Sequence, residues 1–157
     1  IGMPGDRIQM IDGVLQINDE AVILEDGGVF EEVMEYQGPQ GLRPRCENGA
    51  VGQGAVCEKS RQYETLPGGT RHSILNIGDQ FSDNTGVFTV PDDHFFFMGD
   101  NRDNSTDSRV AQEARGVGFV PREDIVGRAD RVMFSSAGRS MLAFWTWRSD
   151  RFFKAIE

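Results

Sequence analysis

The sequence has few of the residues and segments on which several protein classes depend. It holds only two cysteines and two histidines among 157 residues, and it has no long apolar run, no signal peptide and no initiator methionine. Two thiols cannot build a structural zinc site by themselves, and His72 and His94 stand far apart without partners at ligand spacing. The opening Ile1-Gly2-Met3-Pro4 leads us to expect a piece of a longer protein.

Basic residues are also scarce relative to acidic ones. The formal net charge is -9, which argues against a general nucleic-acid binder because neutralising phosphates requires a basic face. Apolar residues make up 38% of the chain and include eleven phenylalanines, so a buried core is expected rather than disorder. The length suits one domain, or one core with a sizeable insert.

Several catalytic and ligand-binding motifs are missing. No Gly-x-Ser-x-Gly elbow occurs, and the glycine-rich stretch 49–54 lacks the Gly-Lys-Ser/Thr ending of a phosphate-binding loop. The spacing Asp103-x-Ser105-x-Asp107 is that of the start of a calcium loop, but Ser108 and Ala114 stand where the EF-hand pattern requires Gly and Glu. We therefore predict neither a metal nor a cofactor.

The hydrophobic pattern predicts an all-β fold. Residues 7–11 and 14–17 nearly alternate around Asp12-Gly13, which favours a hairpin with a type I′ turn. Further strands are predicted over 21–24, 71–77, 87–90, 94–98 and 129–134, and residues 29–36 suit a strand better than the short helix that they also allow. One helical turn is predicted at 121–125 and a loop-rich stretch at 37–69. Cys46 and Cys57 lie in that stretch, where an exported protein would pair them and a cytosolic one would keep them reduced.

The most informative segment is residues 99–109, GDNRDNSTDSR, which follow the apolar residues 95–98. Asx turns would explain Asp100, Asn101 and Asn104 in a solvated loop. They would not explain the arginines and further carboxylates crowded beside them, which suit bidentate pairing that locks a loop. From the residues alone, a rigid polar network near a site and a plain solvated turn both remain open.

Residues 99–109 closely resemble the most characteristic motif of bacterial type I signal peptidases. Residues 116–121 and 125–129 follow as in that family, and residues 2–6 resemble another of its motifs. The resemblance is strong over residues 1–8 and 86–134; between them it is carried only by Glu64-Thr-Leu and the stretch 71–75. On these motifs the chain is identified as a member of the family.

The resemblance implies a signal-peptidase-like β-fold with a β-rich insert and with its N-terminal strands missing. Residues 1–11 and 87–157 would form a partial catalytic core, and residues 12–86 an inserted subdomain. The family consists of serine endopeptidases anchored in the bacterial inner membrane, with the catalytic domain on the periplasmic side. They remove signal peptides from exported preproteins after small residues, typically Ala-x-Ala, with a serine nucleophile and a lysine general base that must be neutral.

Carried over by position, Ser105 should orient the catalytic lysine, with Asp107 and Arg109 as a supporting ion pair. The remaining motif residues should brace the loop or shape the turn after the lysine-bearing strand: Asp100, Asn101, Arg102, Asp103, Gly2, Pro4 and Gly5. An extracytoplasmic location also favours a Cys46–Cys57 disulfide. Residues 110–115 should form an exposed loop beside the site.

The family lysine lies three residues before the position of Ile1, and the nucleophilic serine lies further upstream. We therefore expect residues 1–157 alone not to cleave an Ala-x-Ala signal peptide, and we expect uncovered sheet edges to favour self-association. Two alternatives to a general signal peptidase are a non-catalytic exported binding module on the same scaffold and a specialised pilin-type signal peptidase. The aromatic, basic segment 141–154 is expected to close the core, although Trp145, Trp147 and Phe152 also suit a membrane interface.

Overall fold

The computed structural model describes residues 1–36, 41–136, 142 and 144–156. It is all-β, as the sequence predicts, and the helices of the described residues are single 3-10 turns. The chain divides into two compact units: residues 1–34 with 45–125, and residues 35–44 with 126–157. The division of the chain into a partial core and an insert at residues 12–86 stays a prediction.

The first unit begins with the predicted hairpin. Strands β1 (Arg7–Ile11) and β2 (Val14–Ile17) pair antiparallel around Asp12 and Gly13, both with the positive φ that a type I′ turn requires. Strands β3 (Glu20–Ala21) and β7 (Phe88–Thr89) extend the sheet to the order β3-β2-β1-β7. The hairpin predicted from the sequence is therefore confirmed.

Alternate side chains of this sheet form the hydrophobic core. The buried members come from the hairpin and from the segments beside it: Ile8, Met10, Leu15, Val22, Val90 and Phe96. Phe96 packs against Phe88 and Phe119, with ring centroids 5.0 and 5.9 Å apart. Phe96, a buried residue of this core, thus lies three positions before Gly99, where the polar run starts.

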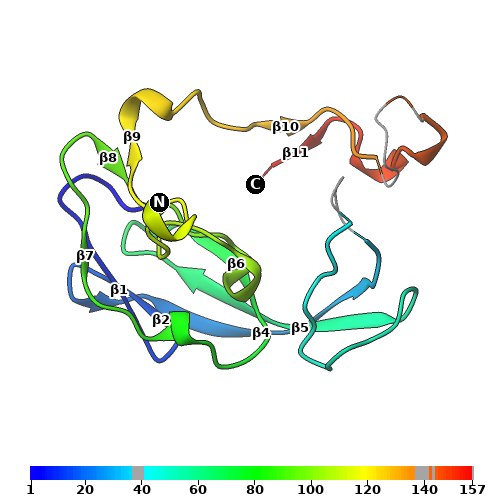
Figure 1. Cartoon of the computed structure of the whole chain (residues 1–157), viewed down its shortest axis with the longest axis horizontal. Helices are drawn as coiled ribbons and strands as arrows, with labels where there is room; N and C mark the ends of the chain where they lie inside the picture. Colours follow the sequence, from blue (N-terminus) through cyan, green and yellow to red (C-terminus); the bar gives the residue numbers. More distant parts are fainter. Residues whose placement is uncertain (37–40, 137–141, 143, 157) are drawn as a thin grey trace. The chain divides into compact units, whose positions relative to one another are not determined.

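A second sheet consists of β4 (Ile23–Val33), β5 (Val56–Thr65) and β6 (Arg71–Asn76), with β5 in the middle (Figure 1). The prediction that residues 37–69 are loop-rich is wrong for β5, and residues 37–40 lie outside the described part. The buried side chains of β5 include Cys57, Lys59 and Glu64. Because ion pairs and a disulfide, not aliphatic groups, fill these positions, the strand lacks the apolar alternation by which a half-buried strand is recognised.

Short elements complete the first unit. Strands β8 (His94–Phe95) and β9 (Val120–Pro121) pair antiparallel, and Gly2 forms an isolated antiparallel bridge to Phe96. The 3-10 turns are η1 (Phe81–Asp83), η2 (Arg102–Asn104), η3 (Gln112–Ala114) and η4 (Arg122–Asp124). The turn η4 confirms the helical turn predicted at 121–125, and residues 111–115 are exposed as expected.

The second unit contains the antiparallel pair β10 (Arg131–Val132) and β11 (Lys154–Ala155), with η5 (Phe144–Thr146) and η6 (Ser149–Arg151) between them in sequence. The expectation that the aromatic segment closes the core is wrong for Leu142, Phe144 and Trp145, which are 69–87% exposed. Of the helices in the described residues, none has the length and apolarity that a membrane crossing requires.

Candidate functional site

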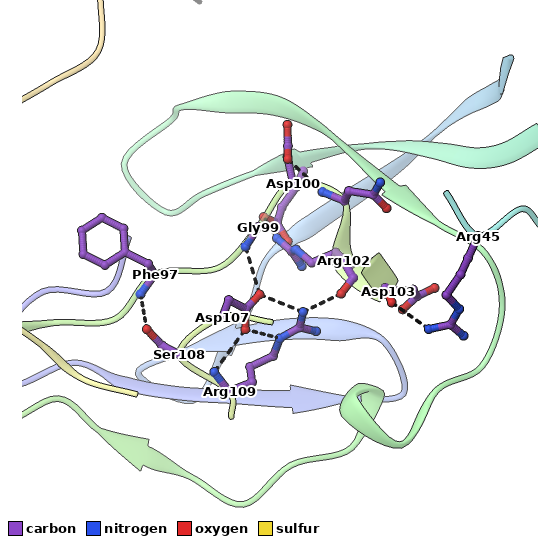
Figure 2. A network of polar contacts seen from close by, with 11 residues as sticks. Arg45, Phe97, Gly99, Asp100, Arg102, Asp103, Asp107, Ser108 and Arg109 are labelled. Carbon is purple, nitrogen blue, oxygen red and sulfur yellow. Dashed lines mark hydrogen bonds and ion pairs between the residues drawn. The ribbon is translucent and has the colours of Figure 1, made fainter. Parts of the chain in front are cut away.

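The polar run 99–109, called the motif loop below, folds back onto the apolar segment that precedes it. Ser108 Oγ accepts a hydrogen bond from the Phe97 backbone N–H at 2.8 Å, and the Ser108 N–H donates to the Phe97 carbonyl at 3.0 Å (Figure 2). Ser108 is 3% exposed. The sequence interpretation gave this serine no role, yet it closes the base of the loop.

Asp107 and Arg109 form the ion pair that the resemblance implies. The Arg109 Nε and Nη2 groups donate to Asp107 Oδ1 and Oδ2, both at 2.9 Å, and the Asp107 side chain also accepts from the backbone N–H of Gly99 at 3.0 Å. Burial alone would raise the pKa of Asp107, but the hydrogen bonds from Arg109 and Gly99 together outweigh it, and the pKa lies below its ordinary value. A buried ion pair therefore joins the two ends of the motif loop.

Ser105 packs directly against Gly99. A Cβ atom placed on Gly99 would lie 2.2 Å from Ser105 Oγ, so any side chain at this position would displace the hydroxyl. Ser105 is half-buried and ends the turn η2 in an extended conformation. Together with Thr106 it lines a pocket of about 450 Å³. The hydroxyl thus occupies a defined place at the edge of an open pocket.

Arg102 ties the motif loop to the second sheet. Its Nη2 donates to Glu64 Oε2 at 2.6 Å, and the two residues are 4% and 1% exposed. The carbonyl of Arg102 accepts from Arg109 Nη2 at 2.6 Å, so the two arginines of the loop are linked. Glu64 Oε2 also lies 3.1 Å from His72 Nε2 on β6.

Asp103 is held by the residue that follows β6 and by a residue of the loop before β5. Its Oδ2 accepts from the Ile77 N–H at 2.7 Å, and its carbonyl accepts from Arg45 Nη1 at 3.1 Å. Burial raises the pKa of Asp103, partly offset by the hydrogen bond from Ile77. Asp103 and Asp107, four residues apart, therefore have pKa values displaced in opposite directions.

Asp100 and Asn101 shape the start of the loop. The Asp100 carbonyl accepts from the Leu75 N–H of β6 at 2.8 Å, and the Asp100 Oδ1 accepts from the N–H of Asn101 at 2.9 Å. Asn101 Oδ1 accepts from the Asn104 side-chain amide at 3.1 Å. The two side-chain contacts are of the Asx type, which a solvated turn would also make. The buried ion pairs described above are therefore what distinguishes a rigid network from a solvated turn.

Gly2, Pro4 and Gly5 lie where the chain approaches the core. Gly2 exchanges two backbone hydrogen bonds with Phe96, at 2.7 and 3.0 Å, and a Cβ on Gly2 would lie 3.1 Å from Ile8 and Phe96. Pro4 and Gly5 are the central residues of a turn closed by the Asp6 N–H and the Met3 carbonyl at 2.9 Å. With φ of +86° at Gly5, this is a type II turn.

The remaining predicted site residues are the cysteines. Cys46 and Cys57 form a disulfide, and Cys57 on β5 is completely buried. In the described part of the chain, no group of three or more His, Cys, Asp and Glu side chains has an arrangement that could hold a metal ion. Two lysines occur in the sequence, Lys59 and Lys154, and the buried Lys59 forms an ion pair with Glu32 on β4.

Reasoning from the sequence missed three residues of the network: Ser108, Glu64 and Arg45. Ser108 lies inside the recognised motif, and Glu64 lies in one of the short matching stretches outside it, so both carried a signal. Arg45 carried none, because it is 58 residues from its partner Asp103 and precedes a cysteine in a glycine-rich segment.

Known proteins of similar sequence point to one family. The model of the family described as signal peptidase, peptidase S26, matches residues 1–134. The chain is 37% identical over 144 residues to Signal peptidase I of Rickettsia typhi, 35% over 144 residues to that of Rickettsia prowazekii and 34% over 147 residues to that of Rickettsia bellii. Each match covers 87% of this chain but only 40–44% of the relative. The chain therefore spans less than half the length of these curated relatives.

Proposed function

Because the chain belongs to the signal peptidase family, peptidase S26, we propose that the protein carrying it is a serine endopeptidase that removes signal peptides from exported preproteins. We place its anchor in the bacterial inner membrane and its catalytic domain on the periplasmic side. The observation that carries the proposal is the position of Ser105, whose hydroxyl packs on Gly99 inside a loop closed by the buried Asp107–Arg109 pair.

Ser105 is proposed to orient the lysine general base. The family lysine stands three residues before the position of Ile1, and Gly2 is paired antiparallel with Phe96. In that register the chain before Ile1 runs alongside Met98 and Gly99, where the Ser105 hydroxyl packs. A lysine amine there has a neutral oxygen nearby that can accept its hydrogen bond.

Asp107, Arg109 and the braced residues 100–103 are proposed to fix Ser105, not to react. A serine attacks a peptide carbonyl only after a base has taken its proton, and a lysine does so only as the neutral amine. Orienting that amine with a neutral hydroxyl, while keeping the carboxylates engaged by Arg109 and Ile77, avoids a nearby anion that would favour the charged lysine.

Signal peptides of the Ala-x-Ala type are the proposed substrates. Shallow pockets on a strand-lined groove admit small side chains and exclude larger ones for lack of volume. The aromatic segment of the second unit, with the exposed Trp145 and Phe152 and the half-buried Trp147, is proposed to contact lipid headgroups or a second copy of the chain.

The test is Ser105→Ala in the protein that carries this sequence. Loss of the orienting hydroxyl should lower the turnover of an Ala-x-Ala signal peptide substrate by ~10²-fold, the scale of a small misplacement of a catalytic group. The melting temperature should change little, because Ser105 is only half-buried. Thr106→Ala, at the neighbouring exposed hydroxyl, is the matched control. Equal turnover of the Ser105→Ala variant and the unmodified protein would reject the orienting role.

A further inference from the structure

We propose that Arg45 is a positioning residue for Ser105, and that the Cys46–Cys57 disulfide holds Arg45 in place. This inference rests on the proposed function and extends it to a residue outside the motif loop. Arg45 contacts both residues that immediately precede Ser105 in sequence. Its Nη1 donates to the Asp103 carbonyl at 3.1 Å, and its own carbonyl accepts from Asn104 Nδ2 at 3.4 Å.

These contacts hold the part of the loop that the ion pair does not reach. Arg109 binds Asp107 and the Arg102 carbonyl, whereas Arg45 binds at Asp103 on the other side, as Figure 2 shows. Residues 102–104 form the turn η2, which ends at Ser105. The turn preceding Ser105 is therefore clamped from two sides, with Arg45 as the clamp supplied by a distant segment.

The anchoring of Arg45 comes from the disulfide. Cys46 is its neighbour in sequence, and the partner Cys57 is completely buried on β5. The next residue continues the attachment, since the Glu47 N–H donates to the Glu58 carbonyl of β5 at 2.8 Å. Ordering a long side chain from a free loop costs conformational entropy, and a backbone already fixed to a buried strand lowers that cost.

A second acceptor fixes the direction of the guanidinium. Arg45 Nη2 donates to Gln80 Oε1 at 3.0 Å, so two nitrogens of one rigid, planar group have separate partners. A lysine ammonium on a flexible stem can reach either the Asp103 carbonyl or Gln80 Oε1, but it has no planar group that holds both acceptors in a fixed orientation. Arginine is therefore the residue that the geometry requires.

The first experiment compares Arg45→Ala, Arg45→Lys and Arg43→Ala in the protein that carries this sequence. Arg45→Ala should lower kcat by ~10-fold, since a displaced catalytic hydroxyl costs up to about 10², and leave KM within about twofold. Arg45→Lys should recover part of the loss. Arg43 is the matched control, because its guanidinium donates to Tyr36 outside the network. Because Arg45 is largely exposed, the melting temperatures of the Arg45 variants should differ little from that of the unmodified protein.

A readout specific to positioning is the pH profile of kcat. If Arg45 acts through Ser105 on the lysine, Arg45→Ala should shift the part of the pH profile in which kcat rises as the lysine base loses its proton. Arg43→Ala should leave this part of the profile unchanged. A kcat and a pH profile for Arg45→Ala that match the unmodified protein would overturn the inference, and so would a loss of kcat with an unshifted profile.

A double-mutant cycle separates this inference from the proposed function. Arg45→Ala should have no further effect in the Ser105→Ala background, because the hydroxyl it positions is gone. A Ser105→Ala variant with full turnover would reject the orienting role of Ser105, whereas no turnover of the signal peptide by the unmodified protein would reject the proposed function itself. A large loss of kcat in Ser105→Ala together with an unchanged kcat in Arg45→Ala would reject only the inference. The inference would also be rejected if Arg45→Ala lowered kcat by the same factor in the Ser105→Ala background as in the unmodified protein.

The disulfide is tested by the paired change Cys46→Ser with Cys57→Ala, and by reduction of the unmodified protein with a thiol. Both treatments should lower kcat, as Arg45→Ala does. Neither should lower kcat further when it is applied to the Arg45→Ala variant. A folded, reduced protein with unchanged kcat would overturn the tether. Because the reduced protein keeps every side chain, this arm does not depend on whether the cysteine variant folds.

Discussion

At the scale of single residues, the site depends as much on a missing side chain as on those present. Gly99 leaves the space in which the Ser105 hydroxyl lies, and its N–H donates to the buried Asp107 carboxylate. A residue with a Cβ atom at position 99 would compete with Ser105 for the same volume. The glycine is thus required by a close approach and not by its backbone conformation.

Gly99→Ala should displace Ser105 and strain the loop. The expected loss in free energy of unfolding is about 1–3 kcal/mol, the usual range for overpacking a filled interior, with a fall in turnover of the signal peptide substrate. Gly52→Ala is the control, because a Cβ there meets no heavy atom within 4 Å and φ is not positive. Urea unfolding of the two variants measures the difference; identical midpoints would contradict the packing argument.

The residues inside the motif could be assigned from the sequence because carboxylates and arginines two to seven positions apart can meet within one loop, as Asp107 and Arg109 do. Arg45 could not be assigned in this way. Nothing local indicates that a residue before Cys46 reaches a carbonyl 58 positions later, since that contact exists only once β5 and β6 have placed both segments.

At the scale of secondary-structure elements, β5 is the strand that connects the second sheet to the site. It carries Glu64, the partner of Arg102, and Cys57, which anchors Arg45 through Cys46. The β1–β2 hairpin was predictable because its turn chemistry and its alternation agree. The strand β5 was not, because its buried positions are occupied by paired charges that look like an exposed segment in sequence.

The buried pair between β5 and η2 should be costly to break on one side only. Arg102→Met leaves the Glu64 carboxylate buried, and the expected loss in free energy of unfolding is about 3–5 kcal/mol. Adding Glu64→Leu should restore much of it, because two apolar side chains then replace the two charges.

The exposed ion pair Arg7–Asp19, with side chains 48% and 64% exposed, supplies the comparison. Arg7→Met should lower the free energy of unfolding by less than about 1 kcal/mol. Denaturant unfolding is measured for Arg102→Met, for Arg102→Met with Glu64→Leu, and for Arg7→Met. Equal unfolding midpoints for Arg102→Met and Arg7→Met would mean that breaking the buried pair costs no more than breaking the exposed one.

At the scale of the whole molecule, a strongly acidic chain exposes a local aromatic and basic surface. The formal net charge is -9, yet Phe144, Trp145 and Phe153 are 63–75% exposed, and Lys154, next to Phe153 in sequence, is exposed as well. Long-range repulsion between acidic molecules opposes self-association, while local apolar contact favours it or favours lipid.

We expect binding to vesicles of phosphatidylethanolamine and phosphatidylglycerol to decrease when Phe144 and Trp145 are both replaced by alanine. Phe81→Ala, at an 88% exposed phenylalanine of the first unit, should leave it unchanged. Co-sedimentation measures binding, and sedimentation velocity without vesicles measures self-association. A patch that serves only self-association would leave vesicle binding of the double variant equal to that of the unmodified protein.

The attachment of the motif loop to the second sheet also bears on the order in which the protein folds. The contacts that hold Arg102, Asp103 and the clamp at Arg45 join residues 38, 26 and 58 positions apart. Long loops must close before such contacts form, and closing them lowers the conformational entropy of the chain. The hairpin β1–β2 can assemble from neighbours along the chain, whereas the geometry around Ser105 can be acquired only after β5 and β6 have docked. A nascent chain would therefore hold no organised site until its last long-range pairings were made.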